Sequence, residues 1–464
     1  MSVILPIESY HREIDFKLLL GAILVEEDSP VILSQHNLVN EISKLLKPSV
    51  YIGKNMYRNH ISGWINESIN LRKNGHILVH LDEEGAFYWG DESEWDRRLK
   101  LRMNLKEVKE EDFILTWGDY QKNYYEKYTD SQNVIATGHP RFCFHIEKYQ
   151  EIYKKRVQEI EEDYGNFILI TTSYDLSNSA FGHERVFSKE NYFDFSSSDS
   201  VKNFGKWWLH TSKMCSEFVN LILNLSQELP EGINIVIRPH PSESSELYEA
   251  AFRNFKNINI VSSDSIVPWI LASKFLISEG CTTIFEAKRL GKDVLIFNPL
   301  DNPEMEMFLP GIMGQKIKEA SEVIKFIGES QSEKYCLNNI RKNPRAAKML
   351  SNLYNIDSFE LISDIIKNIQ TKSRNNSYRY FVKSPFRLHS YIFLREIALN
   401  IRKFLRIFNK KKQKEYLGFQ KTFSKFDRKE LIRKLEIISS VLGKEITIKF
   451  VGKEFAYLLL KKEE

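Results

Sequence analysis

Three short groups of polar residues, each placed directly after an apolar run, could carry chemistry in this chain. The first is Asp82-Glu83-Glu84-Gly85, which follows the run from His76 to His80. Three adjacent carboxylates repel one another, so at least one pKa is expected to rise, which makes a general base plausible. A solvated acidic turn is the alternative, because these residue types are also common in turns.

The second group is Arg238-Pro239-His240-Pro241, which ends the apolar run from Ile233 to Ile237. The fork of an arginine side chain fits a phosphate, and an imidazolium can neutralise or protonate a phosphate leaving group. The prolines on both sides of His240 fix the backbone of the loop. A structural histidine is the alternative, but this uncommon combination favours a functional site.

The third group follows the run from Phe275 to Ser278 and begins a helical pattern. Its candidate residues are Ser278, Gly280, Thr282, Thr283 and Glu286. Hydroxyl groups and free backbone N–H groups at a helix start can hold a phosphate. Glu286, about one turn further on, could reach a ribose hydroxyl. Helix capping is the alternative for the threonines, and a cap residue can also bind a ligand.

These groups need elements that hold them at one edge of a sheet. Short β-branched runs alternate with helix-spaced apolar residues, which is typical of open parallel sheets covered by helices. The expected strands are Val3 to Ile7, Val31 to Leu33, Val50 to Ile52, His76 to His80, Phe113 to Thr116, Asn133 to Ala136, Phe167 to Thr171, Ile233 to Ile237, Ile258 to Val261, Phe275 to Ser278 and Val294 to Phe297. The helices expected among the first of them are Phe16 to Val25, Leu38 to Leu46 and Ile61 to Lys73. Ligands of such sheets bind at the carboxyl ends of the strands, where all three groups fall.

The strands divide into two Rossmann-like domains that face a cleft. We expect an acceptor-side domain over residues 1–142, a nucleotide-side domain over 143–370 and a basic extension over 371–464. A long loop is expected from Phe181 to Trp208. Residues 318–370 are expected to be mainly helical and to pack back across the domain junction.

The charge distribution separates the extension from the rest of the chain. Residues 371–464 hold 24 Lys and Arg against 9 Asp and Glu, whereas residues 1–370 hold 42 against 53. An acidic body with a basic tail argues against a nucleic-acid enzyme, whose basic residues should lie across its working face. With 464 residues, of which 42% are hydrophobic, the chain is long enough for two cores.

The cellular compartment is indicated by three further features. Four scattered cysteines without a Cys-x-x-Cys pattern favour a reducing compartment and argue against a zinc site. No run of about 18 uncharged apolar residues is present, and the start of the sequence lacks the pattern of a signal peptide. We therefore expect a cytoplasmic protein without a metal, peripheral at most at the inner face of the cytoplasmic membrane.

The three groups and their order resemble the motifs of a known class of proteins. The chain resembles bacterial surface carbohydrate biosynthesis proteins, and its motifs are similar to those of the sialyltransferases and Kdo transferases, with the two facing domains of the GT-B glycosyltransferases. The matching elements are Glu83-Glu84-Gly85 (or Asp82-Glu83, with the glycine displaced by one), His240-Pro241, Thr282-Thr283, Arg12-Glu13-Ile14-Asp15, Trp117-Gly118-Asp119-Tyr120-Gln121 and Thr137-Gly138-His139-Pro140-Arg141. The resemblance covers about residues 1 to 310 and adds Glu13, Gly138, His139 and Arg141 as cleft candidates. At His139 the pattern has Asn, so His139 is either a substituted structural residue or an added polar group in the cleft.

The resemblance implies a glycosyltransferase that moves a 2-keto acid sugar, a Kdo or sialic-acid relative, from a CMP-activated donor to a surface polysaccharide or lipopolysaccharide acceptor, with no cofactor. Arg238, His240 and the helix start at Thr282-Thr283 would then stabilise the departing phosphate. One of the three carboxylates would act as base or nucleophile. Three alternatives stay open: a UDP-sugar 2-epimerase, a CDP-glycerol-type glycerophosphotransferase and a non-catalytic polysaccharide assembly factor.

The basic extension contains an amphipathic helical pattern over residues 391–408. Leu394, Ile397, Ile401, Leu405 and Phe408 fall on one helix face and Arg395, Arg402 and Arg406 on another, and Lys410, Lys411, Lys412 and Lys414 follow. Residues 391–414 could lie on an anionic membrane beside a lipid-linked acceptor, or the helix could dock on the second domain. If residues 371–464 form a separate extension, their removal should leave CMP binding intact.

Overall fold

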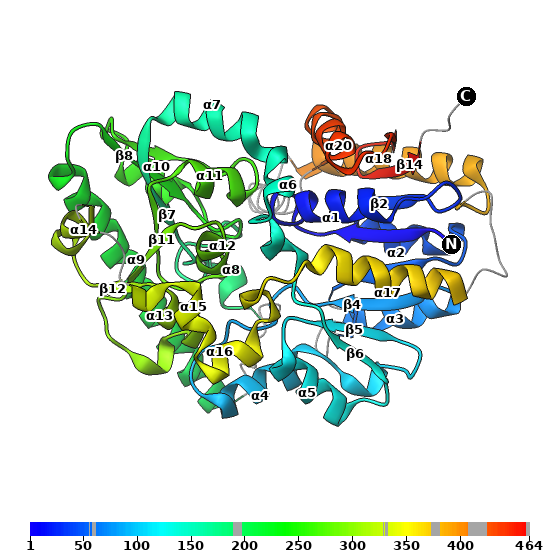
Figure 1. The fold of residues 1–464 in the computed structure, drawn as a ribbon, viewed down its shortest axis with the longest axis horizontal. Helices are drawn as coiled ribbons and strands as arrows, with labels where there is room; N and C mark the ends of the chain where they lie inside the picture. Colours follow the sequence, from blue (N-terminus) through cyan, green and yellow to red (C-terminus); the bar gives the residue numbers. More distant parts are fainter. Residues whose placement is uncertain are drawn as a thin grey trace.

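Two α/β bodies lie next to each other in the molecule (Figure 1). The computed structural model describes residues 1–54, 56–57, 62–188, 197–327, 329, 333–372, 381–406 and 425–460. Within these ranges the chain forms two separate, mainly parallel sheets, each covered by helices. The expected fold class of two Rossmann-like domains is confirmed.

The first sheet has eight strands in the order β13-β14-β2-β1-β3-β4-β5-β6. Its parallel strands are β1 (Val3–Ile7), β2 (Val31–Gln35), β3 (Val50–Gly53), β4 (Ile77–Leu81), β5 (Phe113–Thr116) and β6 (Asn133–Ala136). The helices between them are α1 (Tyr10–Leu24), α2 (His36–Ile42), α3 (Ser62–Lys73), α4 (Glu92–Arg102) and α5 (Asp119–Tyr128). Parallel strands are buried on both faces, so they form the continuous apolar runs from which the sequence predicted all six.

The end of the chain completes this first sheet. After α20 (Arg428–Leu442), the hairpin of β13 (Ile446–Val451) and β14 (Phe455–Leu460) places β14 antiparallel to β2. Lys434 of α20 donates a hydrogen bond of 2.6 Å to Asp15 of α1, and both side chains are buried. The boundary at residue 371 therefore does not separate an independent extension. The sequence missed this because the strand pairing joins residues more than 400 positions apart.

The second sheet has six parallel strands in the order β12-β11-β10-β7-β8-β9. They are β7 (Asn166–Thr171), β8 (Ile233–Arg238), β9 (Ile258–Ile260), β10 (Phe275–Ser278), β11 (Asp293–Phe297) and β12 (Gln315–Ile317). Its helices are α7 (Lys154–Tyr164), α8 (His183–Val186), α9 (Ser198–Glu228), α10 (Glu246–Ala251), α11 (Ile266–Ala272), α12 (Thr283–Arg289), α13 (Phe308–Met313) and α14 (Ala320–Ile327), whereas the short α6 (Glu147–Gln150) packs on the first domain. Only the short edge strand β12 was not expected.

The prediction of a long loop from Phe181 to Trp208 is partly wrong. The helix α9 begins at Ser198 and is 31 residues long, and the Ser197 hydroxyl accepts a hydrogen bond of 3.4 Å from the Ser200 N–H. The serine-rich stretch that indicated a loop thus supplies the N-cap of the longest described helix. Residues 189–196 of the expected loop lie outside the described residues.

The last helices of the second domain return to the first, as expected. They are α15 (Leu337–Arg341), α16 (Pro344–Met349) and α17 (Ser358–Lys372). The backbone N–H of His139 donates to Asn352 Oδ1 at 2.6 Å. Gly138 has a φ of +67°, and a Cβ there would lie 2.3 Å from Asn352 Oδ1. This crossing of the junction therefore requires glycine at position 138.

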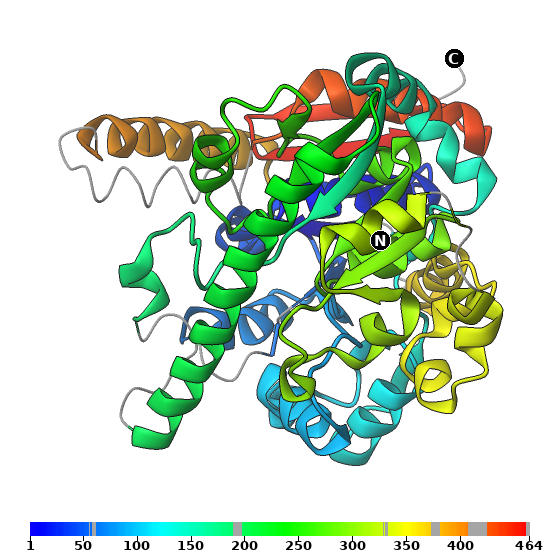
Figure 2. The same ribbon diagram turned by 90° about the vertical axis from the view of Figure 1, so that its left-hand side faces the viewer.

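The helix α18 (Pro385–Arg406) extends away from the body at the upper left of Figure 2. It includes most of the predicted amphipathic helix, but Phe408 and the four lysines that follow it lie outside the described residues. Among the described helices, none combines the length and the hydropathy needed to cross a membrane.

Candidate functional site at the domain junction

The carboxyl ends of the two sheets face each other, and charged side chains from both domains meet there. Arg141, after β6, forms an ion pair with Glu286 of α12, with Nε and Oε1 3.4 Å apart. Both side chains are buried. Arg12 and Arg238 are also near enough to lower the pKa of Glu286, although burial keeps that pKa above its ordinary value. We call Arg12, Arg141, Arg238, His240 and Glu286 the interdomain site.

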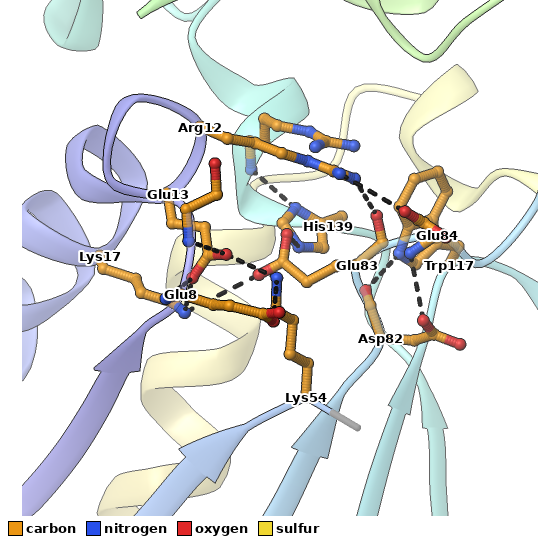
Figure 3. Close-up of polar contacts among 12 residues, drawn as sticks. Glu8, Arg12, Glu13, Lys17, Lys54, Asp82, Glu83, Glu84, Trp117 and His139 are labelled. Atoms are coloured by element: carbon orange, nitrogen blue, oxygen red, sulfur yellow. Dashed lines mark hydrogen bonds and ion pairs between the residues drawn. The ribbon is translucent and has the colours of Figure 1, made fainter. Parts of the chain in front are cut away.

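On the first domain, Glu13 is the centre of a buried network of charges (Figure 3). Its carboxylate accepts hydrogen bonds of 2.6 Å from both Lys17 and Lys54, and of 3.1 Å from the backbone N–H groups of Glu8 and Ser9. Burial raises the pKa of Glu13, but the two ammonium groups outweigh it and lower the pKa to about 2. Glu13 therefore fixes the start of α1 to β3 and has no carboxylate oxygen left for a ligand.

The acidic group after β4 is held by cations from other elements. Asp82 accepts from Arg102 at 2.8 Å and from the Gln121 amide at 2.7 Å, so both of its oxygens are occupied. Glu84 pairs with Arg12 at 3.4 Å and with Arg102 at 3.0 Å, and its side chain is 55% exposed. Glu84 is thus the one carboxylate of this group that a substrate can reach.

The third carboxylate, Glu83, is buried next to His139 (Figure 3). The two side chains approach to 3.5 Å, between His139 Nε2 and Glu83 Oε2. His139 Nδ1 accepts from the Arg141 N–H, so the proton of the neutral ring is on Nε2 and faces Glu83. Burial lowers the pKa of His139 to about 4, despite Glu83. His139 is therefore a neutral, buried residue that positions Glu83 and is not itself open to a ligand.

The expectation that mutual repulsion raises a pKa in the acidic group is wrong. Burial raises the pKa of Asp82 and Glu83, but neighbouring charges and hydrogen bonds outweigh it, and Arg102 and Arg12 lower the pKa of the more exposed Glu84, so all three lie below their ordinary values. Arg102 makes the largest opposing contribution for Asp82 and Glu84, whereas the pKa of Glu83 is lowered by the Nε2–H of His139 beside it and by the ammonium groups of Lys54 and Lys17. These carboxylates are ionised at neutral pH and are weak bases.

On the second domain, the Arg-Pro-His-Pro loop is fixed by Glu243, which the sequence did not identify. This buried carboxylate accepts from the Tyr174 N–H at 2.8 Å, from the His240 N–H at 3.3 Å, and from the hydroxyls of Thr172 and Tyr248. The Arg238 guanidinium donates to the backbone oxygens of Ser263 and Asp264. Pro241 is exposed at the rim of the loop.

The imidazole of His240 is held in one tautomer. Its Nδ1 accepts a hydrogen bond of 3.2 Å from the Ser242 N–H, which leaves the proton on Nε2 when the ring is neutral. Burial and Arg12 lower the pKa of His240, whereas Asp175 and Glu84 raise it. Charged residues of the first domain, Arg12 and Glu84, are thus close enough to His240 of the second domain to change its pKa.

The third sequence group lies at the start of α12 and beside a cavity. Ser278 is buried with its hydroxyl 3.4 Å from Cys281 Sγ, and Thr282 is the N-cap residue of α12 without a side-chain cap hydrogen bond. The capping alternative for Thr282 is therefore not supported. Gly280 lines a cavity of about 140 Å³, together with Trp89 of the first domain.

Two carboxylates of this cavity, Asp175 and Glu279, were missed by sequence reasoning. Burial raises the pKa of Glu279 to about 7 and also raises that of Asp175. Glu279 Oε2 is buried and has no hydrogen-bond partner among the described residues. The available signal was their position: both follow apolar strands, β7 and β10, at the carboxyl edge of the sheet.

A metal centre is not evident in the part of the chain that the structure describes. Among those residues, no group of three or more His, Cys, Asp or Glu side chains is placed to hold a metal ion. The positive charge at the interdomain site comes from the three arginines.

Several solved structures resemble this one in general fold. No protein-family model matches the chain, and no curated protein matches it in sequence. The structure is similar to the wall teichoic acid polymerase TagF, with 12% identity and a TM-score of 0.43 over 80% of this chain and 90% of that one. It is similar to the UDP-GlcNAc 2-epimerase of Methanocaldococcus jannaschii, solved with UDP-GlcNAc and UDP. The identity is 13% and the TM-score 0.48, over 79% of this chain and 99% of that one. It is also similar to MnaA of S. aureus, solved with UDP, with 13% identity and a TM-score of 0.46 over 82% of this chain and 99% of that one. Such similarity concerns the general fold and says nothing of the substrate of this chain.

Proposed function

We propose that this chain is a transferase that breaks the bond between a nucleotide phosphate and an activated sugar, and passes the sugar to an acceptor hydroxyl. The observation that carries the proposal is the set of three guanidinium groups, from both domains, around Glu286. Arg12 and Arg141 come from the first domain and Arg238 from the second. Closing the two domains on a phosphate would bring these charges onto one anion.

Arg141 supports an anionic ligand most directly. Its Nη2 group is buried and has no hydrogen-bond partner among the described residues, whereas its Nε faces the Glu286 carboxylate at 3.4 Å. A buried donor without a partner costs about 1–3 kcal/mol, more for a charged group. A phosphate or carboxylate oxygen at this point would remove that cost. The same group would stabilise the charge that develops as the phosphate leaves.

His240 would complete the phosphate site. In the unliganded protein its lowered pKa favours the neutral ring, with a proton on Nε2 that can be donated to a phosphate oxygen. An incoming phosphate would favour the imidazolium and strengthen this hydrogen bond. The hydroxyls of Thr282 and Thr283 lie at the start of α12 and are further candidate donors.

The base that takes the acceptor proton is assigned to one of two carboxylates. Glu84 is the accessible member of the acidic group, but Arg102 and Arg12 lower its pKa and make it a weak base. Asp175 has a raised pKa and interacts with His240. An efficient general base has a pKa near the working pH, so we favour Asp175 over Glu84.

The donor in this proposal is a CMP-activated 2-keto acid sugar of the Kdo or sialic-acid type, as the sequence resemblance implies. Its acceptor is a surface polysaccharide or a lipopolysaccharide. A donor of this type carries a phosphate and a carboxylate, and the three arginines can pair with both. CDP-glycerol and UDP-sugars are the competing donors, because each presents phosphates to the same site.

The decisive experiment measures binding of CMP, CDP and UDP by calorimetry, and then turnover of CMP-Kdo, CMP-sialic acid, CDP-glycerol and UDP-GlcNAc. We expect CMP to bind and a CMP-sugar to be turned over with release of CMP. Arg141→Lys keeps the charge but removes the fork, and should weaken CMP binding about tenfold or more. Arg97→Lys, at an exposed position of α4, is the matched control. Exclusive turnover of CDP-glycerol or UDP-GlcNAc would replace the donor, and binding of no nucleotide would refute the transferase.

A further inference from the structure

The helix α18 presents an apolar surface to solvent. Phe393 and Leu394 are each 63% exposed. The exposed apolar side chains of this helix are Phe386, Phe393, Leu394, Ile397, Ile401 and Phe404. From Phe393 onward they recur every three or four residues, which places them along one helix face. Six large apolar side chains on one solvated face are unusual for a protein surface and indicate a partner.

The opposite face of α18 is docked on the first domain. Leu388 and Ile392 are buried there. Arg395 pairs with Glu41 at 2.8 Å, and the Tyr391 hydroxyl donates to Glu41 at 2.9 Å. The expected alternative of a helix docked on the second domain is therefore wrong, because these contacts are all to the first. Because this face is fixed to the first domain, the apolar face on the other side of the helix points to solvent.

The charges around this face identify the kind of partner. The helix itself, residues 385–406, contains five basic residues and one acidic residue, Glu396. Glu396 accepts from the Lys453 N–H at 2.6 Å, so the single negative charge is directed to the body. A helix with exposed Phe, Leu and Ile side chains and such an excess of Lys and Arg has the composition of helices that lie in the headgroup layer of anionic membranes.

We propose that α18 binds the surface of an anionic lipid bilayer, with its apolar face at the boundary of the acyl chains and its basic residues at the lipid phosphates. The helix lies in the plane of the membrane and does not cross it. This inference does not depend on which donor the interdomain site takes. A second copy of the chain, attracted through its acidic residues, is the competing occupant of the same face.

The test is co-sedimentation of the full chain with vesicles of equal parts phosphatidylcholine and phosphatidylglycerol, and with vesicles of phosphatidylcholine alone. The test variant combines Phe393→Ser, Leu394→Ser and Ile401→Ser. The control combines Ile69→Ser, Leu101→Ser and Leu361→Ser, which are exposed apolar residues on α3, α4 and α17. Because all six side chains are exposed, neither variant should lose its fold, which circular dichroism will verify.

We expect the natural protein and the control to sediment with the anionic vesicles at low salt, and added salt to weaken the association. The test variant should bind about tenfold less. A natural protein that stays in the supernatant, equal sedimentation with neutral vesicles, or unchanged binding by the test variant would each overturn the proposal. So would a lipid-free dimer in sedimentation velocity that the test variant converts to a monomer, because a second copy would then cover this face.

Discussion

Glu279 combines a raised pKa with a place at the cavity, which makes the stability of the protein depend on pH. The pKa of its carboxyl is about 7 in the fold, against an ordinary value of 4.5. As the pH rises from 4.5 to 7, the unfolded chain releases this proton and the folded chain keeps it, so the free energy of unfolding falls. Above pH 7 the folded protein carries a poorly solvated carboxylate.

We therefore expect Glu279→Gln to raise the free energy of unfolding by about 1–3 kcal/mol at and above pH 7, and by much less near pH 5. Urea denaturation at several pH values measures this difference. Glu304→Gln, at an exposed position, should show no such dependence. An equal gain at pH 5 and pH 8 would show that the carboxylate is not protonated in the fold.

Substitution of His240 should lower turnover far more than stability. His240→Ala removes the Nε2 donor and the hydrogen bond that Nδ1 accepts from the Ser242 N–H, which contributes about 1 kcal/mol to folding. Turnover should fall by about 100- to 10,000-fold, as for the loss of a general acid or phosphate partner. His183→Ala, on the exposed helix α8, is the control. A rate within a few-fold of the natural protein would remove His240 from the mechanism.

At the scale of elements, the contact between α20 and α1 rests on a buried ion pair. Lys434 pairs with Asp15 at 2.6 Å and with Glu430 at 2.6 Å. Lys434→Met leaves the Asp15 carboxylate buried without its cation and should cost about 3–5 kcal/mol of stability. Asp15→Asn combined with Lys434→Met should recover part of that loss. If denaturation shows no loss in the single variant, α20 is not an integral part of the first domain.

Sequence reasoning located the parallel strands well but not the residues that couple them. Strands such as β5 and β10 were predicted to the residue, because buried parallel strands are continuous apolar runs bounded by polar residues. β12 was missed because three residues, Gln315–Ile317, are too few to show a pattern. The start of α9 was missed because its cap residues have the composition of a loop.

The candidate site was predicted in position but not in electrostatics. The three sequence groups do lie at the carboxyl edges of the sheets, since that placement follows from the fold rule alone. The pKa direction of Asp82, Glu83 and Glu84 was wrong because the cations that lower it, such as Lys54 and Arg102, come from other elements. Interactions between distant segments are not visible in one sequence.

At the scale of the whole molecule, the C-terminal segment is part of the first domain. Leu431, Leu435, Phe455 and Leu458 are buried there. Burying each such side chain contributes about 1.5–3 kcal/mol, and a whole domain is stable by about 5–15 kcal/mol. Removing residues 371–464 would take this segment away, so the expectation that CMP binding survives the deletion no longer holds.

We expect removal of residues 425–464 to unfold the first domain. Limited proteolysis should then cleave residues 1–142 rapidly, while the second sheet, which shares no strand with the segment, resists for longer. The triple serine variant of α18 is the control, because it changes exposed residues near the same end of the chain. A truncated protein with unchanged protection of residues 1–142 would contradict the role of β14 in the first sheet.

The pairing of β14 with β2 also determines when the protein can fold during its synthesis. A ribosome has made β2 within the first 35 residues, but its partner β14 exists only after residue 460 has been added. Until then the nascent chain keeps an open strand edge, and Asp15 has no Lys434 to pair with. The second sheet, built from residues 166–317, is complete long before. The domain whose first strands are made first is thus the one that completes its sheet last.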